Sequence, residues 1–129
     1  MAQPSDRLYT KEHEWVKVDG GVAVVGITDY AQSSLGDIVY VELPKPGAQI
    51  AQGKPIGVVE SVKAVSDIYA PVSGTVREVN GAVEDDPAKV NGDPFGDGWL
   101  VKVALSNPAE VKSLLDAAAY DTVVASEAS

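Results

Sequence analysis

The chain contains no cysteine among its 129 residues. This absence excludes disulfide bonds, thiolate metal sites and cysteine nucleophiles, so any thiol chemistry must come from a group attached to the chain. A chain of this length buries about two-thirds of the surface that its unfolded form exposes, which is enough for a core without covalent staples. We expect a single domain over residues 1–129, with its core at about 8–120 and frayed termini.

Basic residues are also scarce. Ten Lys and Arg stand against 19 Asp and Glu, for a formal net charge of -9. This charge argues against nucleic acid and anionic membranes as partners, because both reward Lys and Arg. No stretch is long and apolar enough to span a bilayer. Residues 1–7 lack the apolar region of an export signal and the Arg-rich pattern of a transit peptide, so we expect a cytoplasmic protein.

Catalytic side chains are equally few. The chain has one histidine, His13, and a lone histidine is more often a structural hydrogen-bonding residue than a catalyst, because catalysis needs partners. The sequence shows no phosphate-binding loop of the P-loop type, no cluster of metal ligands and no nucleophile–base pair. We therefore expect no catalytic residue and no metal site, and a stand-alone enzyme is the least favoured class.

What the chain does contain is a series of short runs rich in β-branched residues, separated by turn signals. Asp19-Gly20-Gly21 lies between apolar runs at 15–18 and 22–27, and a DG turn in that setting predicts a hairpin. Further strands are expected at 37–43, 75–79 and 99–105, with turns at 44–47, 52–55 and 80–81.

Short helices are predicted at three places. Thr28 can cap a helix that runs to about Leu35, with Gly36 in the left-handed position that ends it. The acidic loop 84–86 precedes Pro87, a residue suited to the first turn of a helix. The third helix lies near the C-terminus.

That third helix has a start signal and an apolar stripe. Asn107-Pro108-Ala109-Glu110 has the pattern of an N-cap, a proline at the first helical position and a capping-box acid. An apolar stripe predicts an amphipathic helix that lies on the sheet and continues to about Ala125; its members are Val111, Leu114, Leu115 and Ala118. The pattern as a whole predicts a mostly antiparallel β protein with short helices near each end.

Residues 58–68 stand out because they run without Gly or Pro and are dense in β-branched residues. The apolar spacing would also fit a helix, but the composition and the flanking residues favour strand. The run is long for a single strand, usually about 5–6 residues, so we expect a reversal at 61–64. Val62 and Lys63 would then occupy the corner of a tight turn, where Gly, Asn, Asp or Pro is usual. A conflict of this kind is a reason to suspect function.

Lys63 has two interpretations at that corner. A lysine at a hairpin tip is most often simply solvated. However, an exposed corner can also be presented to a modifying enzyme without unfolding anything. An amide-linked acyl group would remove the charge of Lys63 and extend its reach.

The stretch Glu60-Ser61-Val62-Lys63-Ala64, between Gly57 and Asp67, resembles the lipoyl-lysine motif of the glycine cleavage system H protein family. The resemblance covers roughly Leu8 to Tyr120, through blocks in the family's order at 13–16, 26–32, 35–44, 71–74, 93–95 and 98–100. One departure is Phe95, where the family usually carries Tyr. The resemblance implies a flattened β-barrel, or barrel-sandwich hybrid, of the lipoyl-domain type.

The resemblance also implies a cofactor and its partners. Lipoate would be amide-linked to Lys63, in a hairpin recognised by a lipoate ligase or a lipoyl/octanoyl transferase through Glu60, Ser61, Val62 and Ala64. In the family, a pyridoxal-phosphate glycine decarboxylase (P protein) loads an aminomethyl group and releases carbon dioxide. A tetrahydrofolate-dependent aminomethyltransferase (T protein) takes the methylene carbon and frees ammonia, and dihydrolipoyl dehydrogenase (L protein) reoxidises the dithiol. The chain would be a non-catalytic carrier, since the sulfur chemistry belongs to the cofactor.

Two acids are further candidates by the same resemblance. Glu14, ordinarily a surface acid, would line the cleft where the amine-bearing arm rests, because a carboxylate pairs with an amine. Asp67 is a weaker candidate of the same kind. The resemblance begins soon after Met1, which favours a bacterial cytoplasm over a mitochondrial matrix.

Other carriers of similar fold remain as alternatives. A lipoyl-relay protein, which donates lipoate to other lipoyl-dependent enzymes, is poorly separated from a glycine-cleavage carrier by sequence. A biotin carrier normally brackets its lysine with methionines, whereas the only methionine here is Met1. A lipoyl domain of a 2-oxoacid dehydrogenase complex would be shorter and tethered by Ala/Pro-rich linkers, which are missing.

Overall fold

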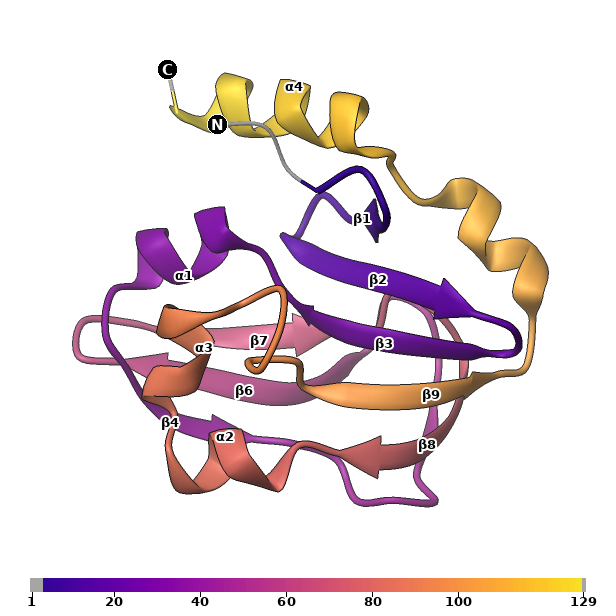
Figure 1. Ribbon diagram of the computed structural model, residues 1–129, viewed down its shortest axis with the longest axis horizontal. Helices are drawn as coiled ribbons and strands as arrows, with labels where there is room; N and C mark the ends of the chain where they lie inside the picture. The colour runs from indigo at the N-terminus through magenta and orange to yellow at the C-terminus, as the bar shows by residue number, and fades with distance from the viewer. Residues whose placement is uncertain (1–3, 129) are drawn as a thin grey trace.

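A computed structural model describes residues 4–128 and shows two antiparallel sheets (Figure 1). The six-stranded sheet has the order β1 (Leu8–Tyr9), β2 (Glu14–Asp19), β3 (Val22–Ile27), β9 (Val101–Leu105), β8 (Gly74–Val79) and β5 (Gln49–Ile50). The three-stranded sheet has the order β4 (Ile38–Glu42), β6 (Pro55–Ser61) and β7 (Val65–Tyr69). The mostly β, antiparallel prediction is therefore confirmed. The expected fraying of the two ends concerns residues outside the described range.

The predicted DG hairpin forms between β2 and β3. Its register pairs Glu14 with Ile27 at one end and Asp19 with Val22 at the other. Gly20 has a φ of +65°, a left-handed conformation that glycine adopts without steric cost. The turn residue therefore sets the register, and with it which side chains of β2 face the core.

The main core lies between the two sheets. Val16, Val25 and Val103 from the large sheet share one cluster with Val59 and Ile68 from the small one. All five side chains are 5% exposed or less. The two sheets therefore stabilise each other through buried apolar surface, worth about 25 cal/mol per Å².

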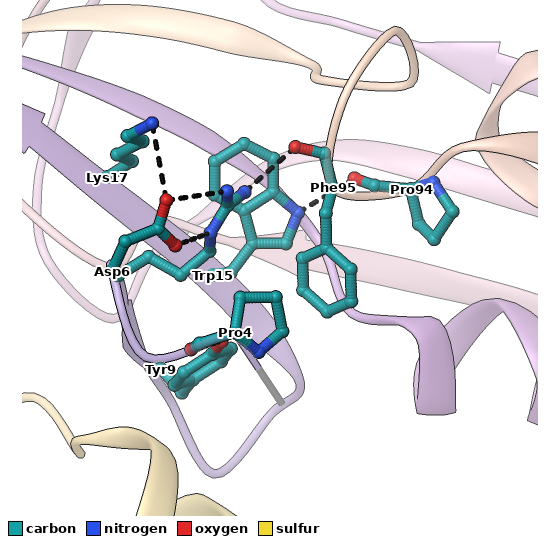
Figure 2. A network of polar contacts seen from close by, with 8 residues as sticks. Pro4, Asp6, Tyr9, Trp15, Lys17, Pro94 and Phe95 are labelled. Atoms are coloured by element: carbon teal, nitrogen blue, oxygen red, sulfur yellow. Dashed lines mark hydrogen bonds and ion pairs between the residues drawn. The ribbon is translucent and has the colours of Figure 1, made fainter. Parts of the chain in front are cut away.

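A second, aromatic cluster joins the N-terminal segment to the end of the chain. Tyr9 and Tyr120 stack with their ring centroids 4.8 Å apart, beside the buried ring of Trp15. Trp15 Nε1 donates to the carbonyl of Pro94 at 2.9 Å, a contact drawn in Figure 2. The Arg7 guanidinium lies 4.6 Å from the Trp15 ring centroid. Strand β2 is thus held on its outer side by residues distant in sequence.

The first helix is α1 (Asp29–Leu35), and its predicted caps are confirmed. Thr28 Oγ1 accepts from the Ala31 N–H at 3.2 Å, and Gly36 ends the helix with a φ of +83°. A small polar side chain and a residue without Cβ thus occupy the two positions that need them.

The helices α2 (Gly81–Asp85) and α3 (Ala88–Gly92) partly correct the sequence prediction. The turn expected at 80–81 is wrong: Asn80 is the N-cap of α2, and its amide donates to the carbonyls of Asp97 and Trp99. Asparagine suits turns and helix caps alike, so local sequence does not separate the two. The helix expected after Pro87 is confirmed as α3.

The single amphipathic helix predicted from Pro108 to about Ala125 is wrong. The chain forms a 3-10 helix η1 (Pro108–Ser113), an extended segment, and then α4 (Ala117–Ala128). Leu115 interrupts the helix because its backbone pairs with that of Tyr9 through two hydrogen bonds of 2.7 and 2.8 Å. The predicted capping box does not form either, because the Glu110 carboxylate accepts from the backbone and hydroxyl of Ser73. Within residues 4–128, every helix falls short of the length and apolarity needed to cross a membrane.

Candidate functional site

The predicted reversal at 61–64 is confirmed as the turn between β6 and β7. The Ser61 N–H donates to the carbonyl of Ala64 at 2.8 Å and closes the turn. Ser61 Oγ accepts from the N–H groups of Ala64 at 3.0 Å and Lys63 at 3.3 Å. Neither Val62 nor Lys63 has a positive φ, so the corner needs no glycine. The serine hydroxyl supplies the local hydrogen bonds that Asn or Asp provides in other turns.

The turn leaves Lys63 accessible at the end of the hairpin formed by β6 and β7. Lys63 is exposed and Val62 is 70% exposed. The Val62 N–H donates to the carbonyl of Asp37 at 3.1 Å, which ties the turn to the segment before β4. A methyl group added to Gly36 would lie 3.6 Å from Lys63 Cε, so the lysine stem passes over the end of α1. An ordered backbone therefore carries an accessible primary amine.

Glu14 is not the surface acid that its residue type suggests, because only 2% of it is exposed. One carboxylate oxygen accepts from Thr10 Oγ1 at 2.6 Å and the other from the Tyr69 N–H at 3.2 Å. Burial raises the pKa of Glu14 to about 7, although both hydrogen bonds act in the opposite direction. The residue borders a cavity of about 270 Å³, which Gln52 and Leu115 also line. This carboxyl group can therefore change protonation near neutral pH.

Asp67 lies apart from this cavity. It is exposed on β7, where it pairs with Val58 of β6. Two residues further on, the backbone of Tyr69 is bonded to Glu14. The structure thus places the two candidate acids near the same strand but does not join them, since the contacts of the described residues include none between Asp67 and Glu14.

His13 is a structural hydrogen-bonding residue, as predicted. Its ring nitrogens lie 2.7 Å from the hydroxyl of Tyr120 and 2.9 Å from a carboxylate oxygen of Glu127, both on α4. The Tyr120 hydroxyl also lies 2.7 Å from Thr28 Oγ1. These contacts tie α4 to the end of β3 and to α1. Sequence reasoning missed Tyr120 and Glu127, because nothing in the local pattern relates them to a histidine 107 and 114 residues away.

A smaller cavity of about 170 Å³ opens beside this network and close to the hairpin. It is lined by side chains from the segment before β2, from α1, from β7 and from α4, among them Glu12, His13, Tyr30, Ser34, Ser66 and Glu127. Six of its eight lining residues are of polar or ionisable type, and the other two are Ala31 and Leu35. Among residues 4–128, no group of three or more His, Cys, Asp or Glu is placed to hold a metal ion.

The fold and the site together define a class of protein: a small two-sheet β domain that presents one lysine on the tip of an ordered hairpin. The glycine cleavage H-protein family model matches residues 7–127, and the chain belongs to this family. The predicted barrel-sandwich type of fold is confirmed by the structural comparison below.

Individual relatives agree with this assignment. The glycine cleavage system H protein of Symbiobacterium thermophilum is 57% identical over 118 residues, which is 92% of each chain. That of Acidobacterium capsulatum is 57% identical over 127 residues, or 98% of each chain. The crystal structure of a glycine cleavage system H protein from Mycobacterium marinum superposes with a TM-score of 0.85 at 45% identity, covering 92% of this chain and 95% of that one.

The buried Glu14 gives a pH dependence whose sign can be worked out. Its pKa is about 7 in the folded protein, against an ordinary value of 4.5. Between these two pH values the carboxyl group is therefore more fully protonated in the folded state than in the unfolded state. The free energy of unfolding therefore falls as pH rises from about 4.5 to 7, and a shift of this size corresponds to a loss of about 3 kcal/mol. Glu14→Gln is neutral throughout and lacks this contribution. Urea unfolding of both proteins from pH 4.5 to 8 measures the difference.

Glu84→Gln is the matched control, because Glu84 is an exposed acid on α2 that does not contribute to the raised pKa of Glu14. This variant should keep the wild-type pH slope, including the part caused by the general negative charge of the protein. If Glu14→Gln also kept it, the carboxyl group of Glu14 would titrate below the measured range and the expected shift would be wrong.

Proposed function

We propose that Lys63 carries lipoate through an amide bond and that the chain is the lipoyl carrier of a glycine cleavage system. The observation that supports this most directly is the exposed amine on a turn whose backbone is held by Ser61. The site suits the group, because Lys63 is exposed and its side chain can be acylated and lose its charge without disturbing the core. The absence of cysteine is consistent with sulfur chemistry supplied by the attached cofactor.

The proposed partners act in turn on the far end of the arm. Glycine decarboxylase would load the aminomethyl group, aminomethyltransferase would pass its methylene carbon to tetrahydrofolate, and dihydrolipoyl dehydrogenase would restore the disulfide. This protein would position the arm, with no catalytic residue of its own. The named relatives are bacterial, and we propose a bacterial cytoplasmic location.

Glu14 has a proposed role within this cycle. An amine-bearing arm that reached the 270 Å³ cavity would meet a carboxyl group whose pKa is about 7. Loss of its proton in response to a nearby cation would create an ion pair in a site of low dielectric constant. Asp67 would contribute only at the exposed side of β7, where solvent weakens such a pair.

The proposal is tested by the intact mass of protein produced in cells supplied with lipoate, with peptide mapping around Lys63. We expect one added lipoyl group, located on Lys63. An unmodified Lys63 in a folded protein, from cells with an active attaching enzyme, would contradict the proposal. Glycine decarboxylation with the three partner enzymes then separates the shuttle from a relay, which would instead pass its lipoyl group to another acceptor domain.

A further inference from the structure

The outer face of the three-stranded sheet carries an apolar surface beside Lys63. Cross-strand pairing places Tyr40, Glu60 and Val65 in one row, next to the turn. The register shifts between Ile38 and Tyr40, so that Val39 is an additional residue on the edge strand β4. β-Bulges often redirect side chains at functional edges. Residues from β4 are thereby brought level with a lysine more than 20 positions later in the chain.

This surface is unusually exposed for its composition. Of the five large hydrophobic side chains that are exposed among the described residues, four belong to it: Val39 at 55%, Tyr40 at 47%, Val62 at 70% and Val65 at 65%. The fifth, Val18, lies on β2 in the other sheet. Exposed apolar side chains that are gathered in one place mark interaction sites more often than scattered ones do. We call the four residues the hairpin patch.

The charge around the hairpin patch has one sign. Strands β4, β6 and β7 contain no Lys or Arg, while Glu42, Glu60 and Asp67 project on the outer face with the patch. Lys63 is therefore a single positive charge beside a surface whose other charged groups on these strands are carboxylates. Two copies of this face would bring carboxylates together, which disfavours self-association through it. A complementary partner has an apolar surface ringed by Lys and Arg.

We propose that the hairpin patch is the docking face for the enzyme that attaches the acyl group to Lys63, and that this enzyme presents such a basic-rimmed apolar surface. The inference rests on the proposed function. It extends recognition from residues 60–64 to Val39 and Tyr40 of a different strand.

The short length of the Lys63 side chain favours the attaching enzyme as the partner that binds the hairpin patch. The attaching enzyme forms a bond to Nζ itself, at the end of a four-carbon stem. Its active site must therefore close around the hairpin, and its surface must meet the residues beside the turn. Enzymes that act on the dithiolane ring work at the end of a much longer arm and need not contact the same surface. Truncation of the patch should consequently impair acylation before it impairs turnover.

The test compares initial rates of acylation by a purified lipoate ligase with lipoate and ATP. We expect Val39→Ser combined with Tyr40→Ser to lower kcat/KM at least tenfold, chiefly through KM, because the lost contacts bind the protein substrate. Val18→Ser removes an exposed valine from the other sheet and is the matched control, with an expected change below twofold. Thermal unfolding of each variant checks that the fold is retained.

A second measurement uses variants driven to full lipoylation with excess ligase. We expect the loaded double variant to support glycine decarboxylation at the wild-type rate. Acylation of the double variant at the wild-type kcat/KM would overturn the inference, as would an equal loss of acylation and turnover. Failure of wild-type protein to accept any acyl group would instead overturn the proposed function. The two failures are therefore distinguishable.

Discussion

Replacement of Lys63 by arginine is expected to abolish lipoyl attachment and, with it, all glycine decarboxylation in the reconstituted system. Arginine keeps the positive charge at the hairpin tip but offers no primary amine for amide formation. The side chain is exposed, so stability should change by no more than about 0.5 kcal/mol. Intact mass, turnover with the three partner enzymes and urea unfolding measure the three consequences.

Lys54→Arg supplies a matched control for this result. Lys54 is exposed and lies just before β6, at the end of the strand opposite Lys63. The Lys54→Arg variant should still carry one lipoyl group and turn over at the wild-type rate. Residual decarboxylation in Lys63→Arg would show that another amine carries the group. Loss in both variants would indicate that the assay responds to lysine replacement in general, and not to loss of attachment at Lys63.

Replacement of Trp15 by alanine should cost about 3–5 kcal/mol of unfolding free energy, the usual range for a buried aromatic residue in a core. Trp15 is 2% exposed and is enclosed by the chain on several sides. A Cβ added to Gly26 would lie 2.6 Å from the indole, which shows how closely β3 approaches the ring. The substitution would also leave the carbonyl of Pro94 without its indole partner (Figure 2). Chemical denaturation in urea measures the loss.

Trp99→Ala makes the same chemical change at a half-buried position. The Trp99 ring packs at the edge of the aromatic cluster, with Lys102 Nζ 4.9 Å from its centroid. We expect less than half the loss seen for Trp15→Ala. Similar losses for the two variants would show that indole size, and not enclosure, determines the cost. Lys63 in either folded variant should still accept an acyl group.

Local sequence was most informative where one residue type has one structural use. The DG turn, Thr28 as a cap and Gly36 as a helix stop were all predicted and all form. Each depends on a backbone geometry that only a few residues favour. The reversal at 61–64 was predicted differently, from a β-branched run too long for one strand.

Prediction failed where a distant segment competes for the same backbone. Leu115 belongs to a sound helical stripe, yet its N–H and carbonyl pair with Tyr9 near the start of the chain. Glu110 has the position of a capping-box acid but bonds to Ser73 instead. Helix propensity contributes only tenths of a kcal/mol per residue, so a pair of long-range hydrogen bonds can override it.

In the candidate site, too, the features set by local sequence were predicted and those set by distant contacts were not. The motif around Lys63 is contiguous, and both its place in the chain and the reversal were predicted from sequence. The corner residues were expected to conflict with the turn, but Ser61 Oγ accepts their N–H groups and removes the conflict. The burial of Glu14 was not predicted, because it depends on Thr10, on Tyr69 and on the cavity that surrounds them.

The sequence by itself determined the class of fold, the hairpin and the lysine that it presents, because these follow from turn residues and β-branched runs within short stretches. Only the tertiary structure decided that Val39 and Tyr40 lie beside Lys63, that Glu14 is buried, and that the C-terminal helix is split. The physical reason is common to all three. Burial and cross-strand contacts between distant segments have energies larger than local preferences, and no local pattern encodes which segments meet.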